Sequence, residues 1–256
     1  MVRLSRTVRF SVQPNGGGRG GGICAYYELD AECLGEPDPS TGYLINIKHI
    51  DQAVRARAIP IIESAIRAES PREPAAHLPA IIDTPRADLP DLARIRWRLA
   101  PTYSIEMEST DMTKAVLRQS FEIACAHRLH VDALSDADNQ RIFGKCNNPN
   151  GHGHNYRFEP AVEIEVGTKS PWGLDDLETV TNETLVARFD HKHLNLDTPE
   201  FGPGGLNPSV ENIARVFYDI LAPQVRDQSG ARAALRSITV WETEKTSCTY
   251  PASAPR

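Results

Sequence analysis

The chain has 256 residues, which is enough for one large domain or two small ones. Hydrophobic residues make up 40% of it and charged residues 24%, as is typical of a globular protein in water. The formal net charge of −6 argues against nucleic acid as a partner, because phosphate binding requires a basic face. A small anionic substrate is still allowed, since a few local cations suffice to bind it.

Two further classes are excluded by simple patterns. No apolar run approaches the roughly 20 residues that a membrane helix needs, so we expect no membrane partner. The first residues, 1–6, lack the apolar core of a signal peptide. The 5 cysteines fit neither a disulfide framework nor a CxxC zinc knuckle. We therefore expect reduced thiols and a cytoplasmic protein.

The first part of the chain predicts a hairpin followed by a helix. Residues 7–12 and 25–34 are expected to be strands, with a flexible glycine-rich loop at 16–22 between them. Turn-forming residues then lead into a third expected strand at 43–47. Apolar side chains recur at helical spacing over 50–68, which predicts a helix.

A proline-rich segment follows at 71–90. Because proline lacks a backbone N–H and fixes its own φ, the segment predicts an irregular connector. A short helix is expected over 89–99, and a strand over 103–108.

The second part of the chain predicts a similar order of elements. We expect strands at 116–126, 152–166 and 237–242, a long loop up to 151, and helices at 174–189 and 211–221. The repeated order predicts two domains, 1–115 and 116–256. A single α+β domain is the alternative.

Three histidines are candidates for a metal site. His152 and His154 are separated by one glycine at the start of an expected strand, so both side chains point to the same face. If this strand pairs with the preceding one, His127 comes level with them. Three histidines with an open fourth position are typical of a catalytic zinc site. His130 is a competing candidate further into the loop.

Cys146 lies in the loop that leads to the histidine pair. Most lone cysteines are buried and inert, and that is the simpler interpretation. The loop position, the neighbouring Lys145 and a nearby metal would instead lower the thiol pKa and favour the thiolate.

Two stretches carry a specific resemblance. Residues 121–129, FEIACAHRL, and residues 143–156, FGKCNNPNGHGHNY, resemble the 6-pyruvoyl-tetrahydropterin synthase family, and the resemblance covers about residues 119–250. It implies the T-fold, in which units of an antiparallel four-stranded sheet with two helices on one face associate into a barrel. It also implies zinc on His127, His152 and His154, with Cys146 as a catalytic base.

Further matches extend the implied site. Asp190 and His191 resemble the pair that joins the cysteine in proton transfer. Ser209 and Glu211 resemble the start of the family's pterin-binding helix, although an N-cap and a favourable helix-dipole position explain them equally well. Glu242 lies on an otherwise apolar strand face, where a carboxylate needs a partner. The resemblance supplies one in the N–H donors of a pterin, which a carboxylate binds in bidentate fashion.

The resemblance implies a substrate and a reaction. The substrate would be 7,8-dihydroneopterin triphosphate, converted by a carbon–oxygen lyase to 6-pyruvoyl-tetrahydropterin with release of triphosphate. The alternatives are 6-carboxy-tetrahydropterin synthase of the queuosine pathway and a non-catalytic pterin-binding protein. Several cations are candidates for binding the triphosphate, and the sequence does not choose among them: Arg128, Arg141, Lys145 and Lys192.

The first half resembles a second, degenerate copy. Residues 35–51 resemble the turn, strand and helix start that follow the histidine-pair strand in the family. The corresponding stretch of the second half, residues 167–176, is shorter than in the family. The first half has no HxH pattern and no cysteine loop. In the family, active sites lie between neighbouring subunits. We therefore expect a tandem T-fold that assembles as a homo-oligomer, a trimer or a hexamer, with one active site per chain.

Overall fold

A computed structural model describes residues 1–13, 24–68, 73–167 and 172–252. The predicted glycine-rich loop at 16–22 lies outside the described residues. The chain divides into two compact units. Unit 1 comprises Met1–Leu117 and Glu163–Pro171, and unit 2 comprises Arg118–Val162 and Trp172–Arg256.

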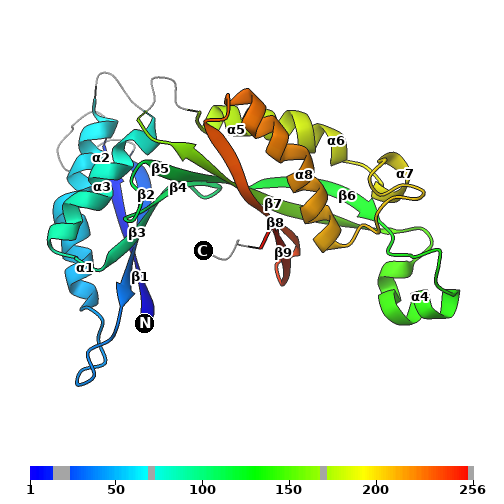
Figure 1. The fold of residues 1–256 in the computed structure, drawn as a ribbon, viewed down its shortest axis with the longest axis horizontal. Helices are drawn as coiled ribbons and strands as arrows, with labels where there is room; N and C mark the ends of the chain where they lie inside the picture. Colours follow the sequence, from blue (N-terminus) through cyan, green and yellow to red (C-terminus); the bar gives the residue numbers. More distant parts are fainter. Residues whose placement is uncertain (14–23, 69–72, 168–171, 253–256) are drawn as a thin grey trace. The chain divides into compact units, whose positions relative to one another are not determined.

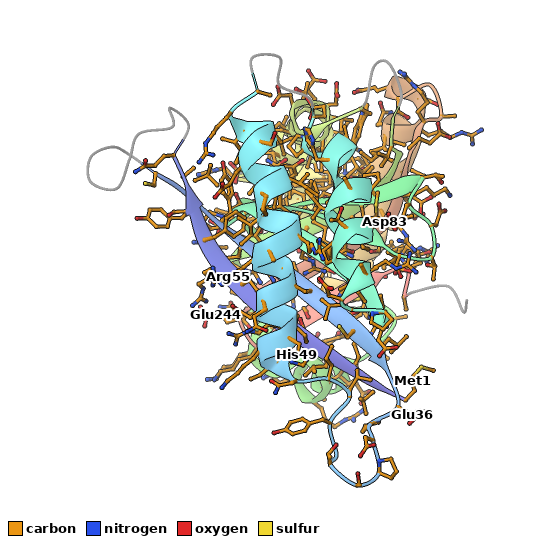
Figure 2. The ribbon with its side chains drawn as sticks, turned by 90° about the vertical axis from the view of Figure 1, so that its left-hand side faces the viewer. Met1, Glu36, His49, Arg55, Asp83 and Glu244 are labelled. Atoms are coloured by element: carbon orange, nitrogen blue, oxygen red, sulfur yellow. The ribbon has the colours of Figure 1, made fainter. Side chains whose placement is uncertain are left out.

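Unit 1 contains an antiparallel sheet whose first four strands follow one another in chain order (Figure 1). They are β1 (Val2–Val12), β2 (Ala25–Gly35), β3 (Leu92–Ala100) and β4 (Tyr103–Glu108). The first helix runs through α1 (Ile47–Ala53), the π-helical turn η1 (Val54–Ala58) and α2 (Ile59–Ile66). The second runs through η2 (Pro74–His77), α3 (Leu78–Asp83) and η3 (Thr84–Ala87). Figure 2 shows these two helices side by side with strands behind them.

Alternation along the strands separates the two faces of this sheet. Ile95 and Trp97 of β3 are buried on one face, while Arg94 and Arg96 point to the other. The second face carries a charged network: Arg94 lies 2.8 Å from Glu32 and 3.4 Å from Glu106, both of which are 5% exposed. Buried carboxylates need such partners, so the arginine ladder keeps this face folded.

Unit 2 contains the strands β6 (Phe121–His127), β7 (His152–Glu165), β8 (Ala233–Thr243) and β9 (Thr246–Tyr250), adjacent in that order. The short β5 (Lys114–Gln119) precedes β6. The loop between β6 and β7 contains α4 (Asp136–Phe143) and the 3₁₀ turn η4 (Gly144–Asn147). The first long helix runs through α5 (Leu174–Thr181), the π-helical turn η5 (Asn182–Val186) and α6 (Ala187–Phe189). The short α7 (Leu194–Asp197) and the long α8 (Val210–Gln228) follow.

The core of unit 2 is formed where α8 packs on β8 and β9. Ser209 begins this helix, because its side chain accepts the Asn212 N–H. Phe217 packs against Phe158 of β7 at a ring-centroid distance of 5.3 Å and against Phe189 at 4.9 Å. The predicted helix at 211–221 is confirmed and extends to Gln228.

The structure corrects the predicted elements of unit 1. The strand predicted at 43–47 is wrong, since Tyr43 is 65% exposed and the Asn46 side chain caps a helix that begins at Ile47. The proline connector is also wrong over residues 74–87, where prolines occupy the first turns of three short helices. Proline is favoured there because the missing N–H would be unpaired anyway. The helix predicted at 89–99 is a strand, β3.

Unit 2 departs from prediction in smaller ways. The strand predicted at 116–126 is divided into β5 and β6 around Ser120, and the long loop contains α4. β9 was not predicted. Antiparallel strands with helices confirm the α+β class, while the tandem T-fold and its barrel remain predictions. None of the helices described is long and apolar enough to cross a membrane.

Candidate active site

The pairing of β6 with β7 sets the position of the three histidines. His127 lies opposite His152, and Cys125 lies opposite His154, so all three imidazoles share one face of the sheet. Their ligand nitrogens lie within 4.8 Å of one another. His130 is directed elsewhere, with its Nδ1 2.9 Å from the Asn147 Oδ1. The histidine group, His127, His152 and His154, can therefore hold a metal ion.

The surroundings of the histidine group fit a cation. The Nδ1 of His127 lies 2.7 Å from the Pro208 carbonyl, so it is the protonated nitrogen and Nε2 keeps its lone pair. The Nδ1 of His152 and the Nε2 of His154 are buried without a hydrogen-bond partner in the described structure. Such orphaned nitrogens are costly unless a ligand completes them.

Burial also favours the neutral form of two of these imidazoles, His127 and His152. It lowers the pKa of His127 to about 4, with the neighbouring histidines contributing, and it lowers the pKa of His152 as well. A neutral imidazole is the form that binds a metal, so the group is ready for a cation at neutral pH.

Glu242 and Tyr156 stand beside the histidine group. The Glu242 Oε1 lies 3.5 Å from the His127 Nε2 and 3.6 Å from the His154 Nε2. The Tyr156 hydroxyl lies 3.5 Å from the same carboxylate oxygen and 3.3 Å from His127. Tyr156 was not identified from the sequence, although it follows His154 by two residues and so shares its strand face. Burial, and then Glu242, raise its pKa, so it remains a hydroxyl donor.

The loop between β6 and β7 holds Cys146 close to this carboxylate. The Leu129 N–H donates to the Cys146 carbonyl at 2.8 Å, and the buried Asn139 amide bonds three carbonyls of the loop. Burial, and then Glu242, raise the pKa of the Cys146 thiol. The expectation that Lys145 and the loop lower the pKa of this thiol is wrong for the protein without a bound metal.

Asp190 and His191 form a hydrogen-bonded pair at the edge of β6 away from β7. The His191 Nδ1 lies 2.8 Å from the Asp190 Oδ2, and the Asp190 Oδ1 accepts the Ala124 N–H at 2.8 Å. His191 has a φ of 57° and a side chain that is 83% exposed. It lines a depression of about 450 Å³ together with His154. No hydrogen bond joins this pair to Cys146 within the part of the chain that the structure describes.

The region that carries the histidine group, the cysteine loop and the aspartate–histidine pair is matched among known proteins. The sequence profile of the family 6-pyruvoyl tetrahydropterin synthase matches residues 116–253. The chain belongs to the 6-pyruvoyl tetrahydropterin synthase family.

Individual relatives agree with the profile. The 6-pyruvoyl tetrahydrobiopterin synthase of Homo sapiens is 38% identical over 110 residues, which are 42% of this chain and 74% of the human protein. That of Poecilia reticulata is 42% identical over 106 residues, which are 41% of this chain and 69% of the fish protein. The solved structure of Caenorhabditis elegans 6-pyruvoyl tetrahydropterin synthase is 32% identical, with a TM-score of 0.49, and covers 55% of this chain and 96% of the nematode chain.

All candidate site residues lie inside the matched region of this synthase family. The two at the start of α8 differ in their surroundings: Ser209 caps the helix, with the Asn212 N–H 3.4 Å from its hydroxyl, whereas Glu211 is exposed. The capping role of Ser209 is confirmed. Substrate binding by either residue remains a prediction.

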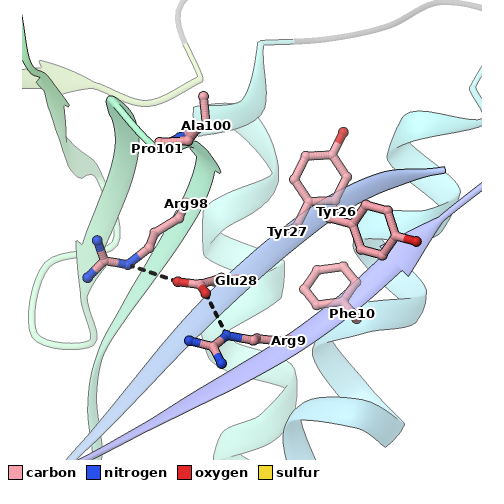
Figure 3. A pocket seen from close by; sticks show the side chains of 8 residues that line it. All are labelled: Arg9, Phe10, Tyr26, Tyr27, Glu28, Arg98, Ala100 and Pro101. Atoms are coloured by element: carbon pink, nitrogen blue, oxygen red, sulfur yellow. Dashed lines mark hydrogen bonds and ion pairs between the residues drawn. The ribbon is translucent and has the colours of Figure 1, made fainter. Parts of the chain in front are cut away.

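Unit 1, outside the matched region up to residue 115, has a cavity of its own. The cavity measures about 450 Å³ and is lined by aromatic and charged side chains, among them Phe10 and Tyr27 (Figure 3). Glu28 lies between the guanidinium groups of Arg9, at 2.7 Å, and Arg98, at 3.7 Å. Among the described residues, neither histidine nor cysteine lines this cavity, in contrast to the histidine group of unit 2.

Proposed function

We propose that this chain converts 7,8-dihydroneopterin triphosphate to 6-pyruvoyl-tetrahydropterin and releases triphosphate. The observation that carries the proposal is the histidine group, oriented by the Pro208 carbonyl and standing beside the Glu242 carboxylate. Family membership supports it, because the relatives bear the name of this synthase.

We propose zinc as the metal, held by His127, His152 and His154. Three imidazoles with an open fourth position suit a catalytic zinc site. When bound, zinc would act as a Lewis acid on the substrate side-chain oxygens. The orphaned Nε2 of His154 and the 3.1 Å approach of the His127 Nε2 to the His152 Nε2 support this fit.

The polar groups beside the histidine group are assigned to the pterin and to proton transfer. Glu242 would accept N–H groups of the pterin ring in a bidentate pair, with Tyr156 holding the carboxylate in place. Ser209 and Glu211, at the start of α8, would bind the substrate beside Glu242. Cys146 would remove a carbon-bound proton as the base.

We assign the second proton transfer to Asp190 and His191. The carboxylate orients the imidazole, whose other nitrogen is left to exchange a proton with substrate. Because the pair is fixed on β6, exposed, and not bonded to its own Cys146, we propose that it serves the site of a neighbouring copy in a homo-oligomer, a trimer or a hexamer.

We propose that unit 1 is a second T-fold unit without an active site. Both units run strand, strand, helix, helix, strand, strand, and in both the first helix contains a π-helical turn, Val54–Ala58 in unit 1 and Asn182–Val186 in unit 2. In both units the second helix packs on the last two strands. This unit would pair exposed sheet edges in the assembly.

The experiment is incubation of the purified chain with 7,8-dihydroneopterin triphosphate, followed by mass analysis. We expect 6-pyruvoyl-tetrahydropterin and triphosphate. A 6-carboxy product would identify the queuosine-pathway reaction instead. Unchanged but bound substrate would identify a non-catalytic pterin-binding protein.

A further inference from the structure

A groove of about 710 Å³ lies in unit 2, beside the loop that follows β6. One wall comes from the start of the loop after β6 and from Asn150, and the other from residues 193–207. Arg128 directly follows His127 along the chain, and Asn207 directly precedes Pro208, the residue that orients His127. Two residues that line the groove are thus chain neighbours of residues at the proposed metal site. Its volume is in the range of small-molecule sites.

Arg128 is fixed in this groove through both its backbone and its side chain. The Asn195 amide accepts the Arg128 N–H at 2.7 Å and donates to the Arg128 carbonyl at 3.1 Å. The Arg128 Nε donates to the Asn147 carbonyl at 3.2 Å. Its two terminal nitrogens have no partner among the described residues. Arg128 lines the groove, and the planar fork of a guanidinium matches the geometry of phosphate oxygens.

A second donor residue lines the same wall. The His130 N–H donates to the Asn207 Oδ1 at 3.2 Å, and the His130 ring is held by Asn147. One carboxylate opposes these donors: the Asp132 Oδ1 lies 3.5 Å from the His130 Nε2. Its side chain is 98% exposed, so solvent and salt screen its charge.

The other cations of the site are less suited to a phosphate chain. Arg141 lies on α4, exposed and paired with Asp138 at 2.9 Å. Lys145 is exposed and does not line the groove. Lys192 lines the separate depression beside His191. Only Arg128, among the four cations that the sequence leaves open, both lines this groove and is held in a fixed orientation.

We propose that this groove binds the triphosphate end of the substrate, with Arg128 as the main phosphate ligand and His130 beside it. The proposal rests on the proposed function, since it assigns the polyphosphate end of that substrate. The pterin and the reacting side chain stay at Glu242 and the histidine group, while the charged leaving group extends along the groove. Arg128 thus contributes to selection of the phosphorylated substrate over the free pterin.

The test measures binding of inorganic tripolyphosphate, which lacks the pterin. The variant Arg128→Gln should weaken its binding about ten- to a hundredfold, as expected for lost hydrogen bonds to a charged group, and should raise KM for the pterin triphosphate with a smaller change in kcat. The affinity of Arg128→Lys for tripolyphosphate should lie between those of Arg128→Gln and the unaltered chain, because lysine keeps the charge but loses the planar fork. Arg215→Gln, an exposed arginine of α8 paired with Asp219, is the matched control and should bind as the unaltered chain does. Zinc content is measured after each titration, because tripolyphosphate chelates divalent cations.

Each outcome bears on the proposal. Equal tripolyphosphate affinity in Arg128→Gln and the unaltered chain would overturn it, as would loss of affinity in Arg141→Gln or Lys145→Gln instead. No binding of tripolyphosphate by the unaltered chain would also overturn it, even if 6-pyruvoyl-tetrahydropterin is formed. Binding that depends on Arg128 without formation of that product would support the groove and reject the proposed function.

Discussion

In unit 2 the end of β6 and the start of β7 carry His127, His152 and His154. In unit 1 the end of β1 and the start of β2 carry Phe10 and Tyr27 instead. The Phe10 and Tyr27 rings pack at 5.9 Å, and Tyr27 meets the buried Trp97 of β3 edge-on at 5.8 Å. In the order of elements, Trp97 stands on the third strand of its unit, as Glu242 stands on the third strand of unit 2.

The comparison indicates how the same local arrangement serves two purposes. The cluster of Phe10, Tyr27 and Trp97 stabilises unit 1 by ring packing and offers no metal ligand, although the Trp97 Nε1 is also buried without a partner in the described structure. The histidine group leaves the His154 Nε2 unpaired in the described structure, and a bound cation would complete it. Unit 2 is thus suited to chemistry and unit 1 to structure.

The largest effect is expected at the proposed base. Cys146→Ala should lower turnover by about 10²- to 10⁴-fold, the range for loss of a positioned acid or base. Metal content and pterin binding should persist, because the thiol is proposed as a base and not as a ligand. Cys248→Ala, on β9, is the control and should keep full turnover. A Cys146→Ala enzyme that works at the rate of this control would remove the assignment.

A stability effect separates the two units. Trp97→Ala should lower the free energy of unfolding by about 3–5 kcal/mol, the usual cost of removing a buried aromatic side chain. Because Trp97 belongs to unit 1, the metal content of the folded variant should not change. Denaturant titration measures the first quantity and elemental analysis the second. Loss of metal in a folded Trp97→Ala protein would contradict the division of roles.

Glu242→Gln should weaken pterin binding about ten- to a hundredfold, because the amide cannot accept two N–H groups. Glu244→Gln, in the turn between β8 and β9, is the matched control. Binding of the product pterin by fluorescence compares the two variants. Equal affinities would mean that Glu242 is not the pterin anchor.

The smallest effect is a pH dependence of the metal-free protein. The pKa of His127 is lowered to about 4 in the folded chain, whereas the unfolded imidazole has its ordinary value near 6.5. Between these values the unfolded chain binds more protons, so stability falls as the pH drops from about 6.5 toward 4. His127→Gln should flatten this dependence of stability on pH. His49→Gln, which changes an exposed residue of α1 in unit 1, should leave it unaltered. Unfolding midpoints across this range measure the slopes, and identical slopes in both variants would show that His127 is not buried neutral.

Much of the site follows from local patterns in the sequence. Strand alternation places His152 and His154 on one face, and hairpin pairing brings His127 level with them. The same alternation would have identified Tyr156. The Pro208 carbonyl that orients His127 could not be predicted, because 81 residues separate the two and only tertiary packing joins them.

The fold was harder to predict where two physical effects compete. Pro74, Pro79 and Pro85 indicate a connector when they are considered as helix breakers, yet they begin helices in the structure. In β3 the arginines alternate with Ile95 and Trp97, which is a strand pattern, so the helix predicted there is wrong. The burial of Glu32 and Glu106 explains why so many arginines are tolerated there.

The most direct test of the central claim, one metal centre per chain and only in unit 2, is the zinc content of protein purified without added metal. We expect about one zinc per chain in the unaltered protein and in His49→Ala, and almost none in folded His152→Ala, because the remaining two imidazoles form an incomplete ligand set. Two metals per chain, or undiminished zinc in His152→Ala, would contradict the account.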